Sequence, residues 1–494
     1  MRPVARRPAV AAADRDLKAA IAVTRFGLGA KPGEIAEAGR DPQGWLKAQI
    51  RREGADLPAA NIEPTPRRVA DLREFQQQKR VVKQEVSNTG QPATPEVRDP
   101  VKDAQRLLRD DTQGDFLARV QLATATDAAF RERWTLFWTN HFTVAAKNIQ
   151  TAVVVGPYES EAIRPHVFGR FVQLLGAVET HPAMMIYLDQ VQSVGPNSPM
   201  VQRANMPARG GFGARLQPAV QRRGNLGLNE NLAREIMELH TVGVNGGYSQ
   251  ADVTEFARAM TGLSIGGFRG AEAQVGETVF RDAAHEPGRR TVMGVRYDQM
   301  GKEQAAAILT DLAAKPQTAR FICTKLARHF VADDPPPALV ARLEKAWMST
   351  GGDLGHVAEV LVDSPEAWAV PAQKFKTPYD FIVSSYRAAG TQPQAFGQVG
   401  PILTALGQKP FDPGSPKGFP DDVASWSAPD NIVKRMQFAQ GFAGQAVQGR
   451  DPKTLAADAL GERLTPATAI AIARAESRPE GFALLLMSPE FQRR

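Results

Sequence analysis

Hydrophobic residues recur at intervals of three and four along most of the chain, whereas runs of alternating β-branched residues are scarce. The first spacing places apolar side chains on one face of a helix, and alternation is what a half-buried strand requires. The sequence therefore predicts an all-α fold, a multi-helix globular array. Small hairpins or irregular loops are expected only near residues 264–298.

Breaks in this pattern divide the chain into three predicted segments. Residues 1–58 are predicted to be an N-terminal helical segment, where Pro32 and Pro42 mark helix starts because proline suits the first helical turn. Residues 59–126 are predicted to be a polar helical insertion, with the linker SNTGQPATPE between two helices. Residues 127–494 form the expected main core.

One long segment, residues 190–225, is rich in Gly, Pro, Gln and Arg and leads into the most polar motif of the chain. Structureless loops of this length are uncommon in compact domains and tend to be lids, binding loops or disorder. We expect a long loop here. Disorder and a functional lid both fit its composition.

Composition narrows the class of protein. The 494 residues are 43% hydrophobic and 23% charged, as in soluble globular proteins. The net charge of +7 is modest, and no Lys/Arg stripe is interleaved with aromatic residues, so no nucleic acid partner is expected. No run of 18 apolar residues exists, so no transmembrane segment is expected, and the N-terminus gives no clear signal peptide.

The segment NENLAREIMELHTVG, residues 229–243, predicts an amphipathic helix that begins at the N-cap Asn229 and ends at Gly243. Asn231 and Glu235 fall at the edge of the polar face. A carboxylate at such an edge loses solvent, which raises its pKa and suits acid–base catalysis. His240 falls on the apolar face and is expected to be buried or to line a cavity. The alternative is a solvated helix whose charges form only i,i+4 pairs.

A second cluster, FRERWTLFWTNHFTV at residues 130–144, is the most aromatic part of the chain. It fits either a core helix with a satisfied histidine or an aromatic-walled pocket. In the pocket, His141 would be a general base or ligand, and Asn140 would bind an oxyanion or hydroxyl. Aromatic walls also suit sugar rings. Two loops, RDAAHEPGRRTVMG and KPFDPGSPKGFP, add His285, Asp412 and Lys417 as candidates.

Together the stretches FWTNHF, NENLAREIMELHTVG, HEPGRRTVMG and FDPGSPKGFP, followed by LLLMSPEFQRR, resemble the bacterial DUF1800 family of uncharacterised proteins. The resemblance extends from about AVTRFGLGAKPGE to the last residue. It implies a helical bacterial protein, commonly exported to a periplasmic or secreted location, and often found beside DUF1501 proteins of the alkaline phosphatase-like type. It implies no established reaction.

The chain departs from the family pattern in three places. Glu286 follows His285 where the family usually has His-Asp-Pro-Gly, and Phe419 stands where the family usually has Trp. The connection before the NEN motif, residues 190–225, is much longer than usual. This third difference is expected to alter access to whatever the motif lines.

Two functions fit these observations. One is an exported hydrolase or lyase acting on a saccharide or related polymer, or another anionic ligand, through Glu/His acid–base chemistry. Its candidate catalytic residues are Glu230, Glu235, His141 and His240. The candidate binding residues are Trp138, Asn140, Asn229, Asn231, Arg234, Glu238, His285, Asp412 and Lys417.

The alternative is a non-enzymatic helical scaffold or binding partner of a DUF1501-like protein. In that case the glutamates of the NEN helix satisfy buried arginines and backbone amides. A weaker third possibility is metal binding by Glu and His. The sequence has none of the usual metal motifs, so no metal ligand is predicted, and the cofactor is unknown.

Overall fold

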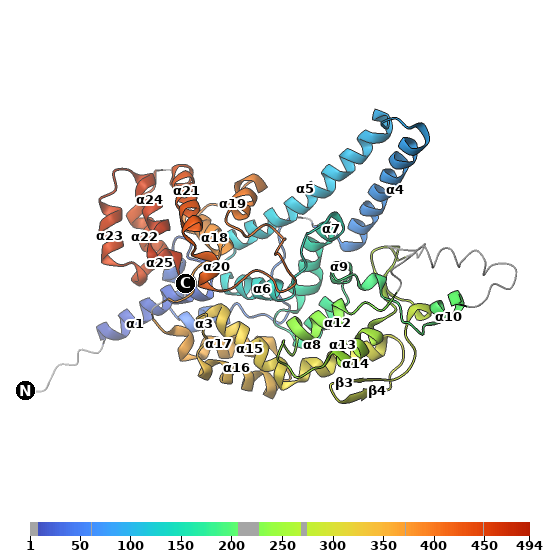
Figure 1. The fold of residues 1–494 in the computed structure, drawn as a ribbon. Coiled ribbons are helices and arrows are strands. Elements are labelled where there is room, and N and C mark those ends of the chain that lie inside the picture. The colour runs from blue at the N-terminus through green and yellow to red at the C-terminus, as the bar shows by residue number, and fades with distance from the viewer. Residues whose placement is uncertain (1–7, 61, 206–226, 268–273, 371, 448) are drawn as a thin grey trace, which may run out of the picture.

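The computed structural model describes residues 8–60, 62–205, 227–267, 274–370, 372–447 and 449–494. Within them the fold is all-α apart from two small hairpins, as predicted (Figure 1). Most of the predicted long loop, residues 206–226, lies outside the described residues. The part before it contains two short helices. In the described segments, no helix has the length and apolar character needed to span a bilayer.

The first part of the chain surrounds one central helix, α6. The helices described up to residue 205 are, in chain order, α1 (Pro8–Ile21), η1 (Ala22–Phe26), α2 (Glu34–Ala38), α3 (Pro42–Lys47), α4 (Thr65–Thr89), α5 (Pro95–Ala125), α6 (Ala129–His141), α7 (Ile149–Tyr158), η2 (Glu159–Ile163), η3 (Arg164–His166), α8 (Phe171–Glu179), α9 (Pro182–Tyr187), η4 (Gln190–Gln192) and α10 (Pro199–Asn205). The start of α3 is as predicted, because Asp41 caps it ahead of Pro42.

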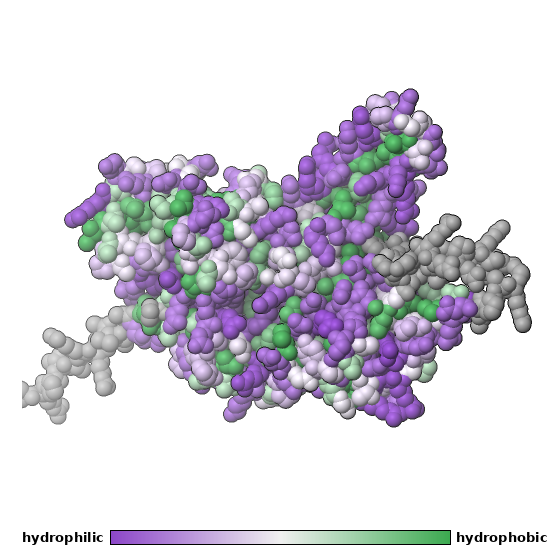
Figure 2. Space-filling model, in the orientation of Figure 1, coloured by the Kyte–Doolittle hydropathy of each residue, from purple (hydrophilic) through white to green (hydrophobic). Residues whose placement is uncertain are grey.

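Helices α4 and α5 form a long hairpin that projects from the body (Figure 1). Its visible surface is mostly hydrophilic (Figure 2). Nearer the body, the buried Arg68 of α4 pairs with Asp111 and Asp115 of α5, at N–O distances of 2.5 Å and 3.0 Å. Two polar helices were predicted here. The division of the chain into three segments remains a prediction.

The second part of the chain adds a helical layer below α6 and a C-terminal bundle beside it (Figure 1). Its described helices are α12 (Asn231–Glu235), η5 (Ile236–His240), α13 (Gln250–Met260), η6 (Asp282–Ala284), α14 (Lys302–Ala314), α15 (Pro316–Phe330), α16 (Pro337–Thr350), α17 (Leu354–Asp363), η7 (Pro365–Trp368), α18 (Pro378–Ala388), η8 (Phe396–Gln398), α19 (Gly400–Ala405), α20 (Val423–Trp426), α21 (Pro429–Ala446), α22 (Pro452–Leu460), η9 (Gly461–Arg463), α23 (Pro466–Ala473), α24 (Arg478–Met487) and α25 (Pro489–Gln492).

The two small hairpins occur where the sequence predicts them. Strand β1 (Leu263–Ile265) pairs antiparallel with β2 (Thr278–Phe280), and β3 (Arg290–Val292) pairs antiparallel with β4 (Val295–Tyr297). Met293 and Gly294 join β3 to β4 with φ of 48° and 78°. Two consecutive positive φ values define the tight hairpin turn that matches strand twist, and glycine suits the second position.

Helix α6 is buried along almost its whole length, which places it at the centre of the core. Phe130 and Trp134 pack against Phe26 and Phe330, with ring centres 5.9 to 6.1 Å apart in the pairs Phe26–Phe130, Phe130–Phe330 and Trp134–Phe330. Such aromatic contacts add to the stabilisation from apolar burial. This face of the segment is therefore core, as one of the two sequence interpretations expects.

Three charged residues of α6 are also buried, and each meets an opposite charge. The pairs are Arg131 with Asp56 (2.8 Å), Glu132 with Arg164 (2.8 Å) and Arg133 with Asp380 (3.2 Å). Buried charges are tolerated when they are paired, and breaking one pair is costly. These pairs join α6 to three distant parts of the chain. They therefore fix the orientation of the helix and so determine which of its side chains line a cavity.

Candidate functional site

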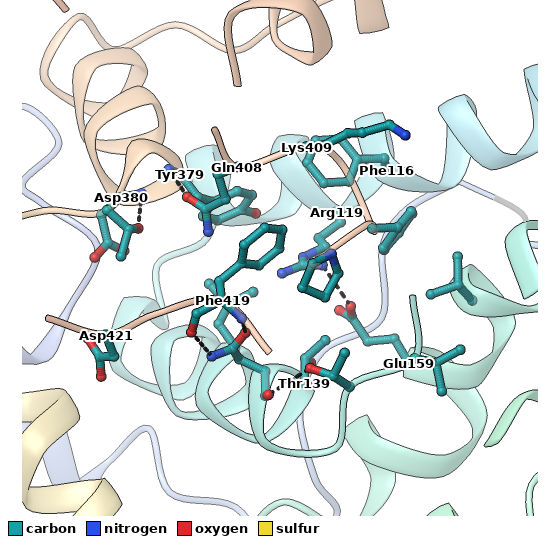
Figure 3. Close-up of a pocket in the computed structure, with 18 of the residues that line it drawn as sticks. Phe116, Arg119, Thr139, Glu159, Tyr379, Asp380, Gln408, Lys409, Phe419 and Asp421 are labelled. Atoms are coloured by element: carbon teal, nitrogen blue, oxygen red, sulfur yellow. Dashed lines mark hydrogen bonds and ion pairs between the residues drawn. The ribbon is translucent and has the colours of Figure 1, made fainter. Parts of the chain in front are cut away.

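A partly open cavity of about 100 Å³ lies against the C-terminal half of α6. Its wall is formed by α5, α6, α7, α15, the start of α18 and residues 408–421, which we call the 408–421 loop. Aromatic rings, amides, arginines and carboxylates share this wall (Figure 3). Apolar surface with a few convergent polar groups is typical of ligand sites.

Asn140, a predicted binding residue, holds the 408–421 loop in place. Its Nδ2 donates to the carbonyl oxygen of Phe419 at 3.0 Å, and its Oδ1 accepts from the Phe419 N–H at 2.8 Å. The neighbouring Gly418 has a φ of 85°, and a Cβ there would lie 2.4 Å from the Asn140 carbonyl oxygen. Glycine is therefore required for this close approach. Asn140 fixes the position of Phe419, which lines the cavity.

Arg119 of α5 lies among three aromatic rings of the wall. Its guanidinium carbon lies near the ring centres of Tyr379 (5.1 Å), Phe411 (5.6 Å) and Phe116 (5.8 Å). An N–O distance of 3.4 Å joins it to Glu159, toward which it points in Figure 3. Its Nε has no hydrogen-bond partner in the described part of the chain. Cation–π contacts hold a guanidinium without using its N–H donors, so Arg119 can offer donors to an anionic ligand.

His329 of α15 lines the cavity and pairs with Asp421 of the 408–421 loop. Its Nδ1 lies 2.9 Å from Asp421 Oδ2. Because an ionised carboxylate can only accept, Nδ1 carries the proton. Nε2 is buried and has no partner among the described residues. Burial lowers the pKa of His329 to about 4, against the opposing effect of Asp421. The ring is therefore neutral at pH 7, and Nε2 is the nitrogen left to accept a proton.

All three carboxylates of the described cavity wall are held in the ionised form. Burial alone would raise the pKa of each, but neighbouring cations and, at Asp421, the hydrogen bond from His329 outweigh burial and lower it. The pairs are Glu159 with Arg119 and Arg164, Asp380 with Arg133 and Arg494, and Asp421 with His329 and Lys374. None of these carboxylates is suited to donate a proton at neutral pH.

Tyr379 of α18 contributes a phenol to the same wall. Its hydroxyl is buried without a hydrogen-bond partner among the described residues. Burial raises the pKa of Tyr379 above its usual value, so the phenol stays protonated at neutral pH. A protonated phenol without a hydrogen-bond partner can donate its proton to a bound ligand. The Tyr379 backbone N–H also donates to Gln408 Oε1 at 2.7 Å, which orients that amide in the wall.

The predicted catalytic residue Glu230 is not part of this wall. Its carboxylate accepts hydrogen bonds from Thr254 Oγ1 (2.6 Å), Gln250 Nε2 (2.8 Å) and Arg234 Nη2 (3.0 Å). The hydrogen bond from Thr254 contributes most to lowering the pKa of Glu230. Thr254 and Gln250 belong to α13, so these contacts join the start of the NEN helix to α13. Its catalytic role remains a prediction.

The NEN helix begins one residue later than predicted. The Asn229 side chain still caps the start of the helix, because its Oδ1 accepts from the Asn231 N–H at 2.8 Å, and its Nδ2 donates to the Asp189 carbonyl at 3.2 Å. Glu230 takes the cap position, and α12 covers Asn231–Glu235. The last turn, η5, is π-helical rather than α-helical. Its end is closed by Gly243, whose N–H donates to the Met237 carbonyl at 3.0 Å.

The other predicted binding residues of this helix lie outside the cavity wall. Arg234 Nη2 donates to Gln250 Oε1 at 2.8 Å, in addition to its bond with Glu230. Glu238 is partly buried beside Tyr248, where burial and then the Glu238 carboxylate raise the pKa of that phenol. Asn231 is exposed. These positions support the helix and its neighbours, and the structure does not bring them together around one ligand.

His240 points into the core, as predicted from its place on the apolar face. Its Nδ1 lies 2.8 Å from Oε1 of Glu179 in α8, and both side chains are fully buried. The contact is close but not in a hydrogen-bonding direction, since neither side chain has a hydrogen bond within the described residues. Glu235 is partly buried nearby. Burial raises the pKa of Glu235, and His240 opposes the rise.

His141 meets His240 rather than the cavity, with ring centres 6.1 Å apart. Its Nε2 lies 3.2 Å from the His240 carbonyl oxygen, and its Nδ1 lies 2.8 Å from Lys325 Nζ. A carbonyl only accepts, so Nε2 carries the proton and Nδ1 accepts from Lys325. Burial lowers the pKa of His141 well below its usual value. The adjacent Trp138 is fully buried against Phe142, with ring centres 5.9 Å apart.

The loop candidates have mainly local partners. His285 Nδ1 donates to the Thr261 carbonyl at 2.8 Å. Asp412 pairs with Lys409 at 2.6 Å, and Lys417 is exposed. Glu286, which replaces the usual Asp of the family pattern, accepts from the backbone N–H and Nδ2 of Asn197 at 2.7 Å and 2.6 Å. Glu286 therefore anchors the segment just before α10.

Sequence reasoning missed the residues that make the cavity chemically distinctive. Asp421 follows directly after the KGFP motif, and this was the available signal for it. His329 was hidden because a histidine in the last turn of a helix is expected from the helix dipole alone. Arg119 was hidden within a long polar helix, and Tyr379 sits in a short helix without any motif.

Among the described residues, no three His, Cys, Asp or Glu side chains are arranged to hold a metal ion. A family model described as "Protein of unknown function (DUF1800)" matches residues 21–493, nearly the whole chain. Neither a curated protein nor a solved structure matches the chain.

Proposed function

The chain belongs to the DUF1800 family, for which no function is described, and we propose that it is a lyase acting on a carboxylate-bearing saccharide. The observation that carries the proposal is the state of His329: Nδ1 is committed to Asp421, and Nε2 is left without a partner beside a cavity. This is how a histidine general base is oriented by a carboxylate. Export of the protein, expected from the family resemblance, belongs to the same proposal.

The proposed reaction is an elimination. His329 Nε2 accepts the proton from the ring carbon that bears the carboxylate. The C–H electron pair becomes a double bond to the adjacent carbon, and the bond from that carbon to the bridging oxygen breaks. Tyr379 donates its phenolic proton to the leaving oxygen. Arg119 binds the substrate carboxylate, which makes the neighbouring C–H more acidic.

The charge state of the cavity favours elimination over hydrolysis by a carboxylate pair. A glycosidase of the usual kind needs one carboxyl group that stays protonated near neutral pH. The carboxylates of the described wall all have lowered pKa values. An imidazole base and a phenol acid perform elimination without such a group. A bound anion would also raise the pKa of His329, because negative charge favours the imidazolium.

The first experiment measures double-bond formation. The purified protein is incubated with uronate polymers (alginate, polygalacturonate and hyaluronan) and with a neutral glucan, and the unsaturated product is followed by its ultraviolet absorbance. We expect product from at least one uronate polymer and none from the glucan. Chain cleavage without a double bond, or no product from any of these polymers, would contradict the proposal.

Matched variants assign the roles. His329→Gln is expected to lower turnover by about 10²- to 10⁴-fold, the usual contribution of a general base. His356→Gln is the control, because that imidazole lies on α17 and is 44% exposed. Tyr379→Phe removes a hydroxyl without a described partner and should lower turnover while the protein melts normally. Tyr386→Phe in the same helix is its control. Equal activity of His329→Gln and His356→Gln would remove His329 from the mechanism.

The second candidate function is the non-enzymatic scaffold, with a DUF1501-like protein as its partner. The contacts of Glu230 favour it, since all three of its hydrogen bonds join α12 to itself or to α13. Under this proposal the cavity variants would leave partner binding unchanged. Pull-down with a co-encoded DUF1501 protein, before and after substitution of His329, would separate the two functions.

A further inference from the structure

Lys325 of α15 has an unusual partner for a lysine in a protein interior. Its Nζ lies 2.8 Å from Nδ1 of His141 and 5.5 Å from the centre of the Phe321 ring. The side chain is partly buried. No carboxylate lies within ion-pair distance of Nζ in the described part of the chain. Lys374 shows the ordinary arrangement, because its Nζ pairs with Asp333 at 2.6 Å and Asp421 at 3.1 Å.

The groups around Lys325 make its charged form costly. His141 is neutral and has its proton on Nε2, so it accepts a hydrogen bond but brings no negative charge. Burial lowers the pKa of Lys325 to about 8, and Lys417 and Arg328 act in the same direction, while Asp421 opposes them. Desolvation and neighbouring cations are the two ways in which proteins produce nucleophilic lysines.

We propose that Lys325 is a nucleophilic amine that captures an anionic aldehyde or ketone as a Schiff base. The amine lone pair attacks the carbonyl carbon and forms the C–N bond. His141 Nδ1 accepts the two nitrogen protons one after the other and passes each to the carbonyl-derived oxygen. The C–O bond then breaks, the oxygen leaves as water, and the nitrogen lone pair completes the C=N bond of a neutral imine. Lys417 and Arg328 attract the negative charge of the ligand. This site involves two residues of the sequence motifs, His141 and Lys417, that the elimination in the cavity does not use.

The test labels lysines of the full-length protein with two matched aldehydes. Pyridoxal 5′-phosphate carries an anionic group and pyridoxal does not. After borohydride reduction, the labelled peptides are quantified by mass spectrometry. At pH 8 we expect pyridoxal 5′-phosphate to label Lys325 at least about tenfold faster than the exposed Lys345. The reason is that roughly half of the Lys325 side chains would be unprotonated, against under about 1% for an ordinary lysine.

Three controls separate the possible outcomes. Lys325→Arg keeps the charge and should abolish the fast label, whereas Lys345→Arg should leave it intact. Lys417→Ala raises the pKa of Lys325 and so slows both aldehydes, but it should slow the phosphate-bearing aldehyde several-fold more than pyridoxal. Equal rates at Lys325 and Lys345 would overturn the nucleophilic amine, and an unchanged ratio of the two aldehydes in Lys417→Ala would overturn the anion preference. Neither outcome depends on elimination activity, so this proposal and the lyase proposal can fail separately.

Discussion

Two regions of the molecule each place a histidine next to a carboxylate, and they differ in what surrounds the pair. His329 and Asp421 form a hydrogen bond of 2.9 Å at the wall of a cavity. His240 and Glu179 lie 2.8 Å apart in the core, fully buried and without a hydrogen bond in the described residues. The comparison shows that a histidine–carboxylate pair becomes a candidate for catalysis only when it lines a cavity that a ligand can enter.

The two regions also differ in the direction in which they shift the pKa of their carboxyl groups. Around the cavity, arginines lower the pKa of Glu159 and Asp380, and His329 and Lys374 lower the pKa of Asp421. In the NEN helix, burial raises the pKa of Glu235. The cavity thus keeps its acids ionised and leaves proton transfer to an imidazole and a phenol. The NEN helix is where a protonated carboxyl group could exist, but it is not part of the cavity wall.

The largest expected effect comes from breaking the charge network of the cavity. Arg164 is fully buried and pairs with Glu132 at 2.8 Å and Glu159 at 2.6 Å. Arg164→Met leaves both carboxylates buried and uncompensated, so the free energy of unfolding should fall by about 3–5 kcal/mol in urea denaturation. Arg52→Met is the control, because Arg52 is 73% exposed and its pair should contribute at most about 1 kcal/mol. A similar loss of unfolding free energy in both variants would contradict the stabilising role of the buried ion pairs of Arg164.

The next effect is a pH dependence of opposite sign in the two regions. His329 binds a proton less readily when folded, so its contribution is present above pH 6.5 and is lost as pH falls toward about 4, by up to about 3 kcal/mol. Glu235 binds a proton more readily when folded, so its contribution grows as pH falls. Unfolding curves from pH 7 to 4 should flatten in His329→Gln and steepen in Glu235→Gln. A shared direction would show that the two regions are not electrostatically distinct.

A smaller effect is expected at the join between the NEN helix and α13. Glu230→Ala removes three hydrogen bonds at a partly exposed site and should cost about 1–2 kcal/mol in thermal or urea unfolding. Glu303→Ala, at an exposed first-turn position of α14, should change stability by less than about 0.5 kcal/mol. Turnover in both variants should match the unchanged protein. Loss of turnover in folded Glu230→Ala would return Glu230 to the catalytic candidates.

The smallest effect is expected at Arg234. Its side chain is 37% exposed, and its partners Glu230 and Gln250 remain hydrogen-bonded to each other without it. Arg234→Gln should therefore change the free energy of unfolding by less than about 0.5 kcal/mol. A loss of more than about 2 kcal/mol would mean that the polar face of this helix is more tightly coupled to the core than its contacts indicate.

Local features of the fold were predictable because they depend on neighbouring residues. The capping box at Ser249 and Asp252 starts α13, and Ser488, followed by Pro and Glu, caps α25. Ser364 begins the same Ser-Pro-Glu sequence as Ser488 but behaves differently, because its hydroxyl donates back to the Val360 carbonyl and the following turn is a short 3₁₀ helix. The residue types at such a segment therefore predict where one helix ends and the next begins, but they do not determine which hydrogen bond the serine makes.

The site was less predictable, because its chemistry arises from pairs far apart in the chain. His329 and Asp421 are 92 residues apart, and nothing in helical periodicity indicates that they meet. Lys325 and His141 are 184 residues apart. The sequence correctly indicated that the edge of the NEN helix raises the pKa of Glu235. It could not indicate that this edge lies outside the wall of the cavity at α6, since a cavity depends on how several helices pack.

The π-helical turn at residues 236–240 sets how this segment tolerates changes in length. A π turn spans one residue more than an α-helical turn, so deleting one residue would let the segment relax to the α form. An insertion, or a second deletion that the π turn cannot absorb, would instead rotate every following side chain by about 100°. His240 would leave Glu179, and the residue replacing Gly243 would meet the Phe321 ring, where a Cβ would lie 2.7 Å from a ring carbon. Insertions and deletions should therefore be tolerated in the 90–94 turn of the projecting hairpin, whereas residues 236–243 should accept no change of length beyond the one residue that the π turn absorbs.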